Sequence, residues 1–508
     1  MAPSTNLSPR VEELKVGPSK RHQNWLKDPG LRKLNLGIFC MFMSSAGTGY
    51  NGSLMNGLLV LPEFTMITGG LRPSILGLLI AATSLGAFCA FTPASYIADR
   101  LGRKWCVRVG ASLVILSAFL QIFVKTHWAF FGCRVLAGAG VGTAQTAAPL
   151  LATEIAHPRQ RQTATALYNA CWALGSITSA SVCFGTLSMS SHWSWRAACV
   201  IQAFFPIVQI IGLTFVPESP RWLISKGRND EALAILIKYH ANGDKEDEMV
   251  QHEFHQICET INIEALEPRS WGSFFSSRGD MHRLIICIML GLMQEWAGNG
   301  IISYYLAPIL ASVGVTRAAD QASVNLGLQV WNLLLSSAGA IASERYGRRP
   351  LWLVGTMIML FFLCMMTIVA GVFQDMHIAA AGMAMIPMIF LFFSGFNIAY
   401  SPLFIAYAAE ILPFPLRAKG MAIALTTDAV ACFFNQYVNP VAFAALHWRY
   451  YLVYIGCLTW FLVTVYFLFP ETKGRTLEEI SMIFDRKDIV SDESSEVSQE
   501  IHAATEKV

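Results

Sequence analysis

The chain has 508 residues, of which 54% are hydrophobic and only 14% are charged, whereas soluble domains carry about 25% charged residues. This shortage of charge excludes an ordinary globular protein, a disordered chain and a secreted disulfide scaffold. The formal net charge of +3 is too small to indicate a nucleic-acid-binding surface. We therefore expect a membrane protein whose twelve cysteines are small buried hydrophobes.

Residues 1–33 are polar and basic, which indicates a cytoplasmic N-terminal leader rather than a cleavable signal peptide. Long apolar runs follow. A bilayer-spanning helix takes about 20 residues, and each run must be helical because hydrocarbon offers the backbone no hydrogen-bond partners. The sequence predicts an all-α membrane protein with twelve transmembrane helices, at about residues 34–58, 74–98, 105–124, 127–152, 164–187, 197–217, 283–311, 322–343, 351–374, 378–409, 418–445 and 450–469.

A long polar stretch at residues 218–282 divides the spans into six and six. We expect a first six-helix bundle at 34–217, a cytoplasmic linker at 218–282, a second bundle at 283–470 and a cytoplasmic tail at 471–508. Within the linker, Glu231–His240 and Glu246–Ala265 have apolar residues at helical spacing. They predict short amphipathic helices at the inner membrane surface.

The distribution of basic residues predicts the orientation, because loops on the cytoplasmic side are enriched in lysine and arginine. If both termini are cytoplasmic, the basic residues of the outer loops are limited to Arg72, Lys125, Arg196, Arg317 and Arg449, out of 37 lysines and arginines in the chain. The sequence therefore favours cytoplasmic termini.

Three charged motifs occur once in each half, in the same order. DRLGRK at 99–104 returns as ERYGRR at 344–349, PESPR at 217–221 returns as PETKGR at 470–475, and Glu154 and Glu410 are each followed seven residues later by an arginine. The shifts are 245, 253 and 256 residues, so the halves are expected to be duplicated bundles related by pseudo-twofold symmetry.

The repeated motifs place carboxylates and guanidinium groups at the same ends of the bundles, where they can pair with each other and with helix-end carbonyls. We expect such pairs to hold the inner ends of the two bundles together in one state and to release them in another. Positive-inside bias alone is the alternative explanation for any single basic residue. The predicted inner gate network contains Asp99, Arg100, Arg103, Glu154, Arg161, Glu218, Arg221, Glu344, Arg345, Arg348, Glu410, Arg417 and Glu471.

Together with GYNGSLMNG at 49–57, these motifs resemble the sugar porter family of the major facilitator superfamily, over about residues 34–485. GNGIISYYL at 298–306 and FFNQYVNP at 433–440 are most similar to the fungal hexose and disaccharide branch, which includes lactose-permease-like proteins. The resemblance implies the major facilitator fold and transport of a sugar by alternating access.

A sugar site needs amides that hydrogen bond to hydroxyls, and polar residues inside spans are costly enough to suggest function. Helix-to-helix hydrogen bonding is the alternative for each amide. The resemblance places Tyr304 and Tyr305 at an outer gate. The expected substrate-binding residues are Asn169, Gln294, Glu295, Asn299, Asn332, Asn397 and Asp428.

The chain departs from the family pattern at positions that bear on coupling. Asn51 stands where proton-coupled members have an aspartate, which favours facilitated diffusion. Glu295 and Asp428 are carboxylates where the family has neutral residues, and two buried carboxylates in one cavity repel each other. At least one of them is therefore a candidate proton site, although the pair could instead select a cationic or unusually polar substrate. The tryptophan common in span 10 of the family is absent, and Ile405 lies near its expected place.

We expect a facilitator that moves a hexose or disaccharide, as a uniporter or with H⁺, and is not an enzyme. The sequence contains no nucleotide-binding or hydrolase motif, and it predicts no cofactor, no metal and no nucleic-acid partner. A monomer surrounded by membrane lipid, in the plasma membrane, is expected. The alternatives are transport of a secondary metabolite or other polar solute by a diverged porter, and a non-transporting sugar sensor.

Overall fold

The computed structural model describes residues 28–64, 72–266, 271–312, 314–376, 379–474, 479–480 and 482–484. These residues form helices joined by turns, and no strand occurs among them. The predicted leader up to residue 27 and the predicted tail from residue 485 lie outside the described residues.

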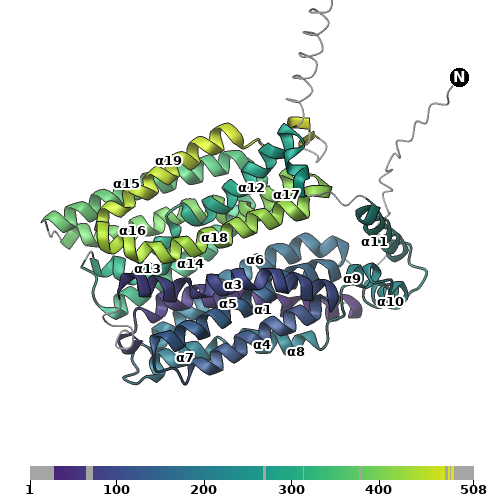
Figure 1. The fold of residues 1–508 in the computed structure, drawn as a ribbon, viewed down its shortest axis with the longest axis horizontal. Coiled ribbons are helices and arrows are strands. Elements are labelled where there is room, and N and C mark those ends of the chain that lie inside the picture. The colour runs from purple at the N-terminus through teal and green to yellow at the C-terminus, as the bar shows by residue number, and fades with distance from the viewer. Residues whose placement is uncertain are drawn as a thin grey trace, which may run out of the picture.

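The first half of the chain forms a helical bundle, drawn in purple and blue in Figure 1. Its first helix begins where the side chain of Asp28 accepts hydrogen bonds from the amides of Gly30 and Leu31, each at 3.0 Å. The helices are α1 (Pro29–Leu58), α3 (Pro73–Arg100), α4 (Arg103–Gln121), α5 (His127–Ile155), α6 (Arg161–Thr186), α7 (Trp193–Ile201) and α8 (Phe204–Leu213).

The second half forms another bundle, drawn in green and yellow. Its helices are α12 (Arg278–Trp296), α13 (Asn299–Ser312), α14 (Ala318–Tyr346), α15 (Arg348–Met376), α16 (Ala379–Gly395), a π-helical turn η3 (Phe396–Tyr400), α17 (Ser401–Ile411), α18 (Phe414–Leu446) and α19 (Tyr451–Leu468).

These helices agree with the predicted spans. By length and hydropathy, nine stretches of the described residues are apolar enough to cross a membrane, and one of them, Lys419–Leu468, contains most of α18 and all of α19. The nine omit α1 and α6, which are 30 and 26 residues long and pack against each other. Their polar side chains can therefore face protein instead of lipid. With these included, a helical unit stands at each of the twelve predicted positions.

Three predicted spans are interrupted within the membrane-spanning region. Span 6 is divided into α7 and α8, and span 10 contains the π-helical turn η3. Span 7 breaks between α12 and α13 at Gly298, whose φ of +92° is a left-handed conformation that glycine adopts at little cost. Interrupted helices free backbone and side-chain polar groups in the interior, which is where transporters bind solutes.

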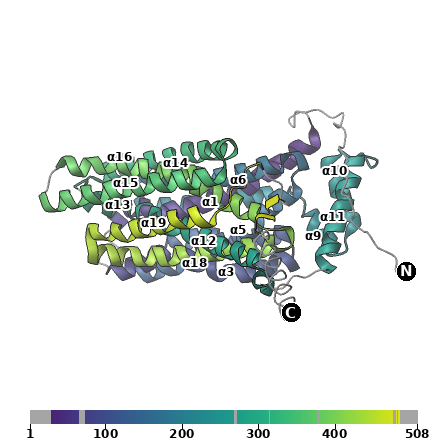
Figure 2. The same ribbon diagram turned by 90° about the horizontal axis from the view of Figure 1, so that it is seen from above.

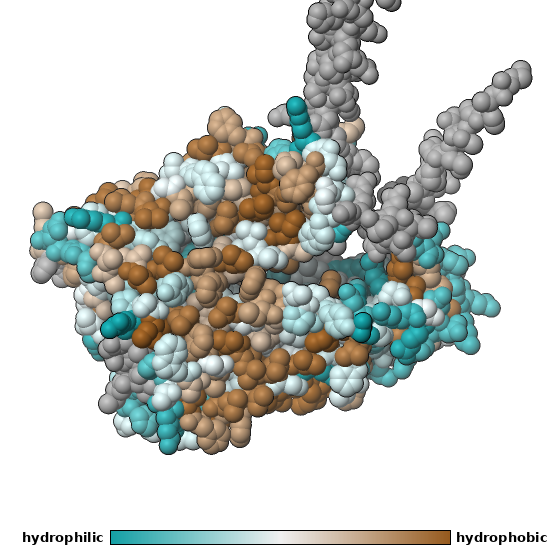
Figure 3. Space-filling view, in the orientation of Figure 1, coloured by the Kyte–Doolittle hydropathy of each residue, from teal (hydrophilic) through white to brown (hydrophobic). Residues whose placement is uncertain are grey.

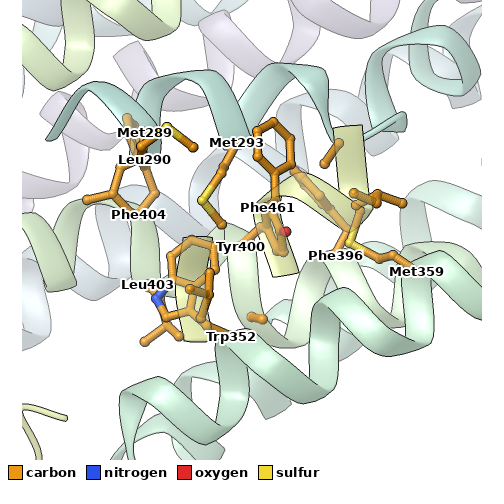
Figure 4. Close-up of a cluster of buried hydrophobic side chains, with 14 of the residues drawn as sticks. Met289, Leu290, Met293, Trp352, Met359, Phe396, Tyr400, Leu403, Phe404 and Phe461 are labelled. Atoms are coloured by element: carbon orange, nitrogen blue, oxygen red, sulfur yellow. The ribbon is translucent and has the colours of Figure 1, made fainter. Parts of the chain in front are cut away.

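Each half has its own apolar core. The first contains residues from Leu34 to Val216, and the second contains residues from Phe274 to Phe484. Figure 4 shows part of the second core, where Trp352 and Tyr400 face one another with their ring centroids 4.7 Å apart. Aromatic pairs in this edge-to-face arrangement add to the stabilisation that burial provides.

The polar linker forms a third helical unit with its own apolar cluster, which we call the linker module. It consists of α9 (Pro220–Ser225), α10 (Asn229–His240) and α11 (Glu248–Leu266), so helices are found at both predicted amphipathic segments. Figures 1 and 2 show the module at one end of the molecule, which we call the linker end. Figure 3 shows hydrophilic residues over this module and hydrophobic residues over the two bundles.

The two bundles meet along α3 with α18, and along α6 with α14. At the end opposite the linker module, which we call the distal end, Val60, Ala307 and Ala322 from the two halves form an apolar cluster. Close by, the amide of Asn56 donates to Oδ1 of Asn325 at 3.0 Å. The distal end is therefore closed by contacts between the halves.

Candidate functional site

Two carboxylates from the second half lie together where α12 packs on α18. The helices approach closely at Gly291, where a Cβ atom would come within 2.7 Å of the Asp428 amide nitrogen. One turn further along α12, Glu295 interacts electrostatically with Asp428. Each carboxylate has a buried oxygen with no hydrogen-bond partner among the described residues. The sequence prediction that these two acids share one environment is thus consistent with their positions.

Two amides beside this pair also present acceptors. Gln294 lies on α12 next to Glu295, and Asn299 begins α13 directly after the break at Gly298. Oε1 of Gln294 and Oδ1 of Asn299 are buried and accept no hydrogen bond from any described residue. α12, the start of α13 and α18 therefore carry four buried acceptor oxygens that hydrogen-bond donors of a ligand could satisfy.

Cys432 connects this region to the first half. Its Sγ atom lies 3.4 Å from Oγ of Ser84 on α3, 3.7 Å from the hydroxyl of Tyr304 and 3.2 Å from Nε2 of Gln436. Ser84 also donates to Oε1 of Gln436 at 2.8 Å. Sequence reasoning treated Cys432 as a buried hydrophobe and missed Ser84. The four-residue spacing of Asp428, Cys432 and Gln436 was the available signal, because it places all three on one helix face.

The two predicted outer-gate tyrosines lie at the boundary between the halves. Both Tyr304 and Tyr305 pack against the apolar core of the first half. The hydroxyl of Tyr305 donates to the carbonyl of Gln436 at 2.6 Å, and its own backbone, with φ of −131° and ψ of 26°, departs from the helix. Their position is compatible with a gate on the distal side, which stays a prediction.

The remaining predicted amides are arranged differently. Asn397, in the π-helical turn, donates to Oδ1 of Asn332 and to the carbonyl of Phe393, each at 2.9 Å. These two amides satisfy one another between helices, which favours a structural role over substrate binding. Asn169 is exposed on α6.

The first half contains a buried arginine that sequence reasoning did not select. Arg134 is 2% exposed, and its Nη2 atom donates to the backbone carbonyl of Asn51 at 3.2 Å. Its Nε and Nη1 atoms have no hydrogen-bond partner within the described part of the chain. The Asn51 side chain supplies no negative charge to this guanidinium, and its own amide donates to the carbonyl of Gly47 at 2.9 Å.

The charged motifs form one network in each half, both at the linker end. In the second half, Arg348 binds Glu410 through Nε and Nη2, the latter at 2.7 Å. Thr472 donates to the same carboxylate at 2.5 Å. In the first half, Arg103 Nε lies 3.5 Å from Glu154, which also accepts a hydrogen bond from Ser219.

A glycine and a carboxylate complete each network in the same way. Glu471 accepts from the amides of Arg348 and Arg349, both at 3.0 Å, beside Gly347, whose φ is +98°. Glu218 accepts from the amide of Lys104 beside Gly102, whose φ is +104°. A Cβ on Gly102 or Gly347 would come within 2.4 or 2.8 Å of the neighbouring carboxylate.

The pKa values of Glu218 and Glu471 are shifted in opposite directions. Burial raises the pKa of Glu218 above its ordinary value, in spite of the two amides that it accepts from. Burial alone would also raise the pKa of Glu471, but hydrogen bonds from the amides of Lys473, Arg348, Arg349 and Thr472 hold it below the ordinary value.

Other predicted members of the inner gate network pair differently from expectation. Arg161 binds Glu253 of the linker module at 2.6 Å rather than Glu154. Arg417 donates to the carbonyl of Leu412 at 3.5 Å. Two arginines lie over neighbouring aromatic rings, Arg100 over Tyr96 and Arg345 over Tyr346. Asp99 lies 3.4 Å from Arg103, and Arg221 acts electrostatically on Arg161. The side chain of Glu344 lies outside the described residues.

The predicted latch would join the two bundles, but among the described residues every one of these ion pairs joins groups within one half or links the first half to the linker module. In the part of the chain that the structure describes, the halves are thus joined at the distal end, and no ion pair joins them at the linker end. A state with a closed linker end stays a prediction.

Comparison with known proteins agrees with this architecture. A family model described as "Sugar (and other) transporter" matches residues 37–484. "Hexose transporter 2" of Kluyveromyces lactis is 27% identical over 507 residues, covering 95% of this chain and 88% of that protein. "MFS-type transporter oryC" of Aspergillus oryzae is 27% identical over 446 residues, covering 85% of this chain and 82% of that protein.

Among solved structures, the xylose transporter XylE from E. coli in a partially occluded inward open conformation superimposes with a TM-score of 0.72. It is 20% identical, and the match covers 88% of this chain and all of that one. This likeness confirms the major facilitator fold. Because the family model covers most of the chain, this multi-pass membrane protein belongs to the sugar transporter family.

Proposed function

We propose that the chain carries a hexose or a sugar of similar polarity across a membrane by alternating access, without covalent chemistry. The observation that carries this proposal is that Gln294, Glu295, Asn299 and Asp428 each have a buried acceptor oxygen without a partner among the described residues. Sugar hydroxyls donate hydrogen bonds to such acceptors, and unsatisfied buried acceptors are otherwise unfavourable. The curated relatives that carry hexose transporter names support the same class of substrate.

Alternating access is supported by the unequal ends of the molecule. Contacts such as Asn56 with Asn325 hold the halves together at the distal end, while the charged networks at the linker end stay within their own halves. A tilt of one half against the other would exchange these arrangements. We place the linker end and both termini in the cytoplasm of a plasma-membrane monomer embedded in lipid, with bundles at 34–217 and 283–470, following the positive-inside bias of the loops.

We further propose that Glu295 and Asp428 carry the proton in coupled transport. Asn51 cannot titrate, so the carboxylates nearest the proposed sugar site are the remaining groups suited to this task. Protonation removes their mutual repulsion, and a bound proton would therefore favour the state in which they lie together.

The test is uptake of labelled glucose in yeast that lacks its own hexose carriers, with and without an uncoupler. Glu295→Gln keeps the size of the side chain, so it should abolish proton-driven accumulation but spare counterflow, which needs no net proton movement. Asp428→Asn is the matched variant. Accumulation that survives in Glu295→Gln and is lost in Asp428→Asn would assign the proton to Asp428, and accumulation that survives in both would contradict the proton proposal.

Two observations support a second substrate class. Glu295 and Asp428 supply negative charge, and the relative oryC carries the name of an MFS-type transporter without a sugar in it. A diverged porter could use the acids to bind a cationic or polar metabolite. Competition of unlabelled sugars against labelled glucose separates the two classes, because a failure of every sugar to compete would favour the metabolite.

A further inference from the structure

The linker module is attached to the first half by a small buried polar cluster. The turn after α10 contacts the start of α1, where the amide of Gly30 donates to Oδ1 of Asn242 at 2.8 Å. Deeper in the contact, His240 at the end of α10 and Glu253 on α11 are 4% and 5% exposed. They meet the turn between α5 and α6, which lies in the first half. This contact joins three separate parts of the chain.

Both ring nitrogens of His240 face hydrogen-bond acceptors. Nδ1 lies 2.8 Å from Oε2 of Glu253, and Nε2 lies 3.2 Å from the backbone carbonyl oxygen of Ile155. A carbonyl oxygen can only accept, and an ionised carboxylate can only accept. A neutral imidazole carries a single N–H, so it can satisfy one of these two acceptors. The cationic imidazole carries two and satisfies both.

The surroundings keep the acceptor carboxylate ionised. Burial alone would raise the pKa of Glu253, but the hydrogen bond from His240 and the positive charges of His240, Arg161 and His157 hold it below the ordinary value. Arg161 Nη2 binds the other oxygen, Oε1, at 2.6 Å. Glu253 therefore accepts hydrogen bonds from Arg161 on one oxygen and from His240 on the other. The proton shared by His240 and Glu253 is thus bound to the imidazole.

The remaining charged groups around the cluster come from every element packed against it. The ring of His157, which follows α5, lies with its centroid 5.3 Å from that of His240. Glu154 on α5 and Arg221 on α9 act electrostatically on Arg161. Glu253 is the acidic group in direct contact with His240, so the positive charge of the protonated ring is balanced at short range.

From this geometry we infer that His240 is a proton-binding site outside the transport pathway, and that its proton docks α10 and α11 onto the first half. When the solution at the linker end becomes more alkaline, the ring loses one N–H and one acceptor loses its donor. The contact then weakens, and Arg161 becomes free to pair with Glu154 in the charged network of the first half. The docking of the linker module thus follows the pH at this face of the membrane.

The strength of the contact between the linker module and the first half depends on pH through the N–H groups of His240. The second N–H is present only while the His240 ring is protonated, and it is lost when the ring gives up its proton. Docking is therefore strongest at acidic pH and weakest at alkaline pH. The lowered pKa of Glu253 extends the docked range towards acid, because the carboxylate stays ionised there.

Hydrogen exchange of the full-length transporter in lipid nanodiscs tests this inference at pH 6 and pH 8.5. Protection factors, which correct for the intrinsic exchange rate, are compared for peptides of α10 and α11, with α15 as the internal reference. We expect the wild-type linker helices to lose about tenfold protection at pH 8.5, the effect of about one hydrogen bond to a charged group, while α15 is unchanged.

Glutamine carries both of its amide N–H donors on one nitrogen, so His240→Gln can serve only one of the two acceptors. Its linker helices should therefore show the alkaline wild-type protection factors at both pH values. His252→Gln is the matched control, because His252 is exposed on α11, and it should behave like the wild type. Equal wild-type protection at both pH values would overturn the inference, as would full pH dependence in His240→Gln. If His240→Gln also loses protection in α15 and so fails to fold, Glu253→Gln, which removes the charged acceptor, replaces it with the same expectation.

Counterflow measured at the same two pH values gives a second readout that does not depend on proton coupling. If counterflow depends on pH in Glu295→Gln but not in His240→Gln, the pH dependence originates at the linker module. The opposite result would overturn a role of His240 in the pH dependence. Failure of the sugar proposal would leave the exchange experiment intact.

Discussion

At the scale of single residues, two acids that are costly inside membrane spans, Glu295 and Asp428, lie close together on α12 and α18. Cys432 could not be distinguished from eleven other cysteines, because only its neighbours across the bundle interface make it polar. Arg161 was predicted as a member of the inner gate network, and the carboxylate that it binds, Glu253, belongs to the linker module and was not in that network.

Gly102 and Gly347, which repeat between the halves, have positive φ angles and lie against carboxylates. Gly347→Ala should destabilise the second half by about 2 kcal/mol, because a left-handed φ penalises a Cβ and the new atom would crowd the carboxylate of Glu471. Thermal unfolding in detergent measures the loss. Gly456→Ala on α19 is the control, since nothing lies within 4 Å of its Cβ position, and an equal loss in both variants would refute the steric explanation.

At the scale of helices, the spans were predictable and their interruptions were not. Lipid forces every long apolar run into a helix, so the twelve predicted positions needed no knowledge of packing. The break at Gly298 and the π-helical turn around Asn397 depend on tertiary contacts, and the apolar runs continue across both. The linker helices were predictable from their periodicity, whereas their docking through His240 was not.

Close packing of α1 against α6 leads to a prediction about helix pairs. Gly175 lies against α1, where a Cβ would come within 1.8 Å of the backbone oxygen of Ala46, so Gly175→Ala must force the helices apart. We expect a loss of about 3 kcal/mol and weakened transport. Gly185→Ala on the same helix meets no atom within 4 Å and should be neutral or slightly stabilising. Equal melting temperatures for the two variants would rule out the close contact.

At the scale of the whole molecule, duplication organises both structure and proposed function. Each half repeats a network of arginine, glutamate, glycine and hydroxyl side chain, seen in Arg348, Glu410, Gly347 and Thr472. The internal repeats predicted this correspondence, but the sequence contains no information on which conformation the chain adopts. That depends on contacts between the halves, which the structure places at the distal end.

Cross-linking the distal end tests the central claim that the two halves must separate there during transport. Asn56→Cys with Asn325→Cys replaces side chains whose polar atoms are 3.0 Å apart, so a short cross-linker with a methanethiosulfonate group at each end should join the two thiols. We predict that the cross-link abolishes counterflow, that reduction restores it, and that neither single variant loses counterflow in the reagent. Full counterflow by the quantitatively cross-linked protein would contradict alternating access by these two halves.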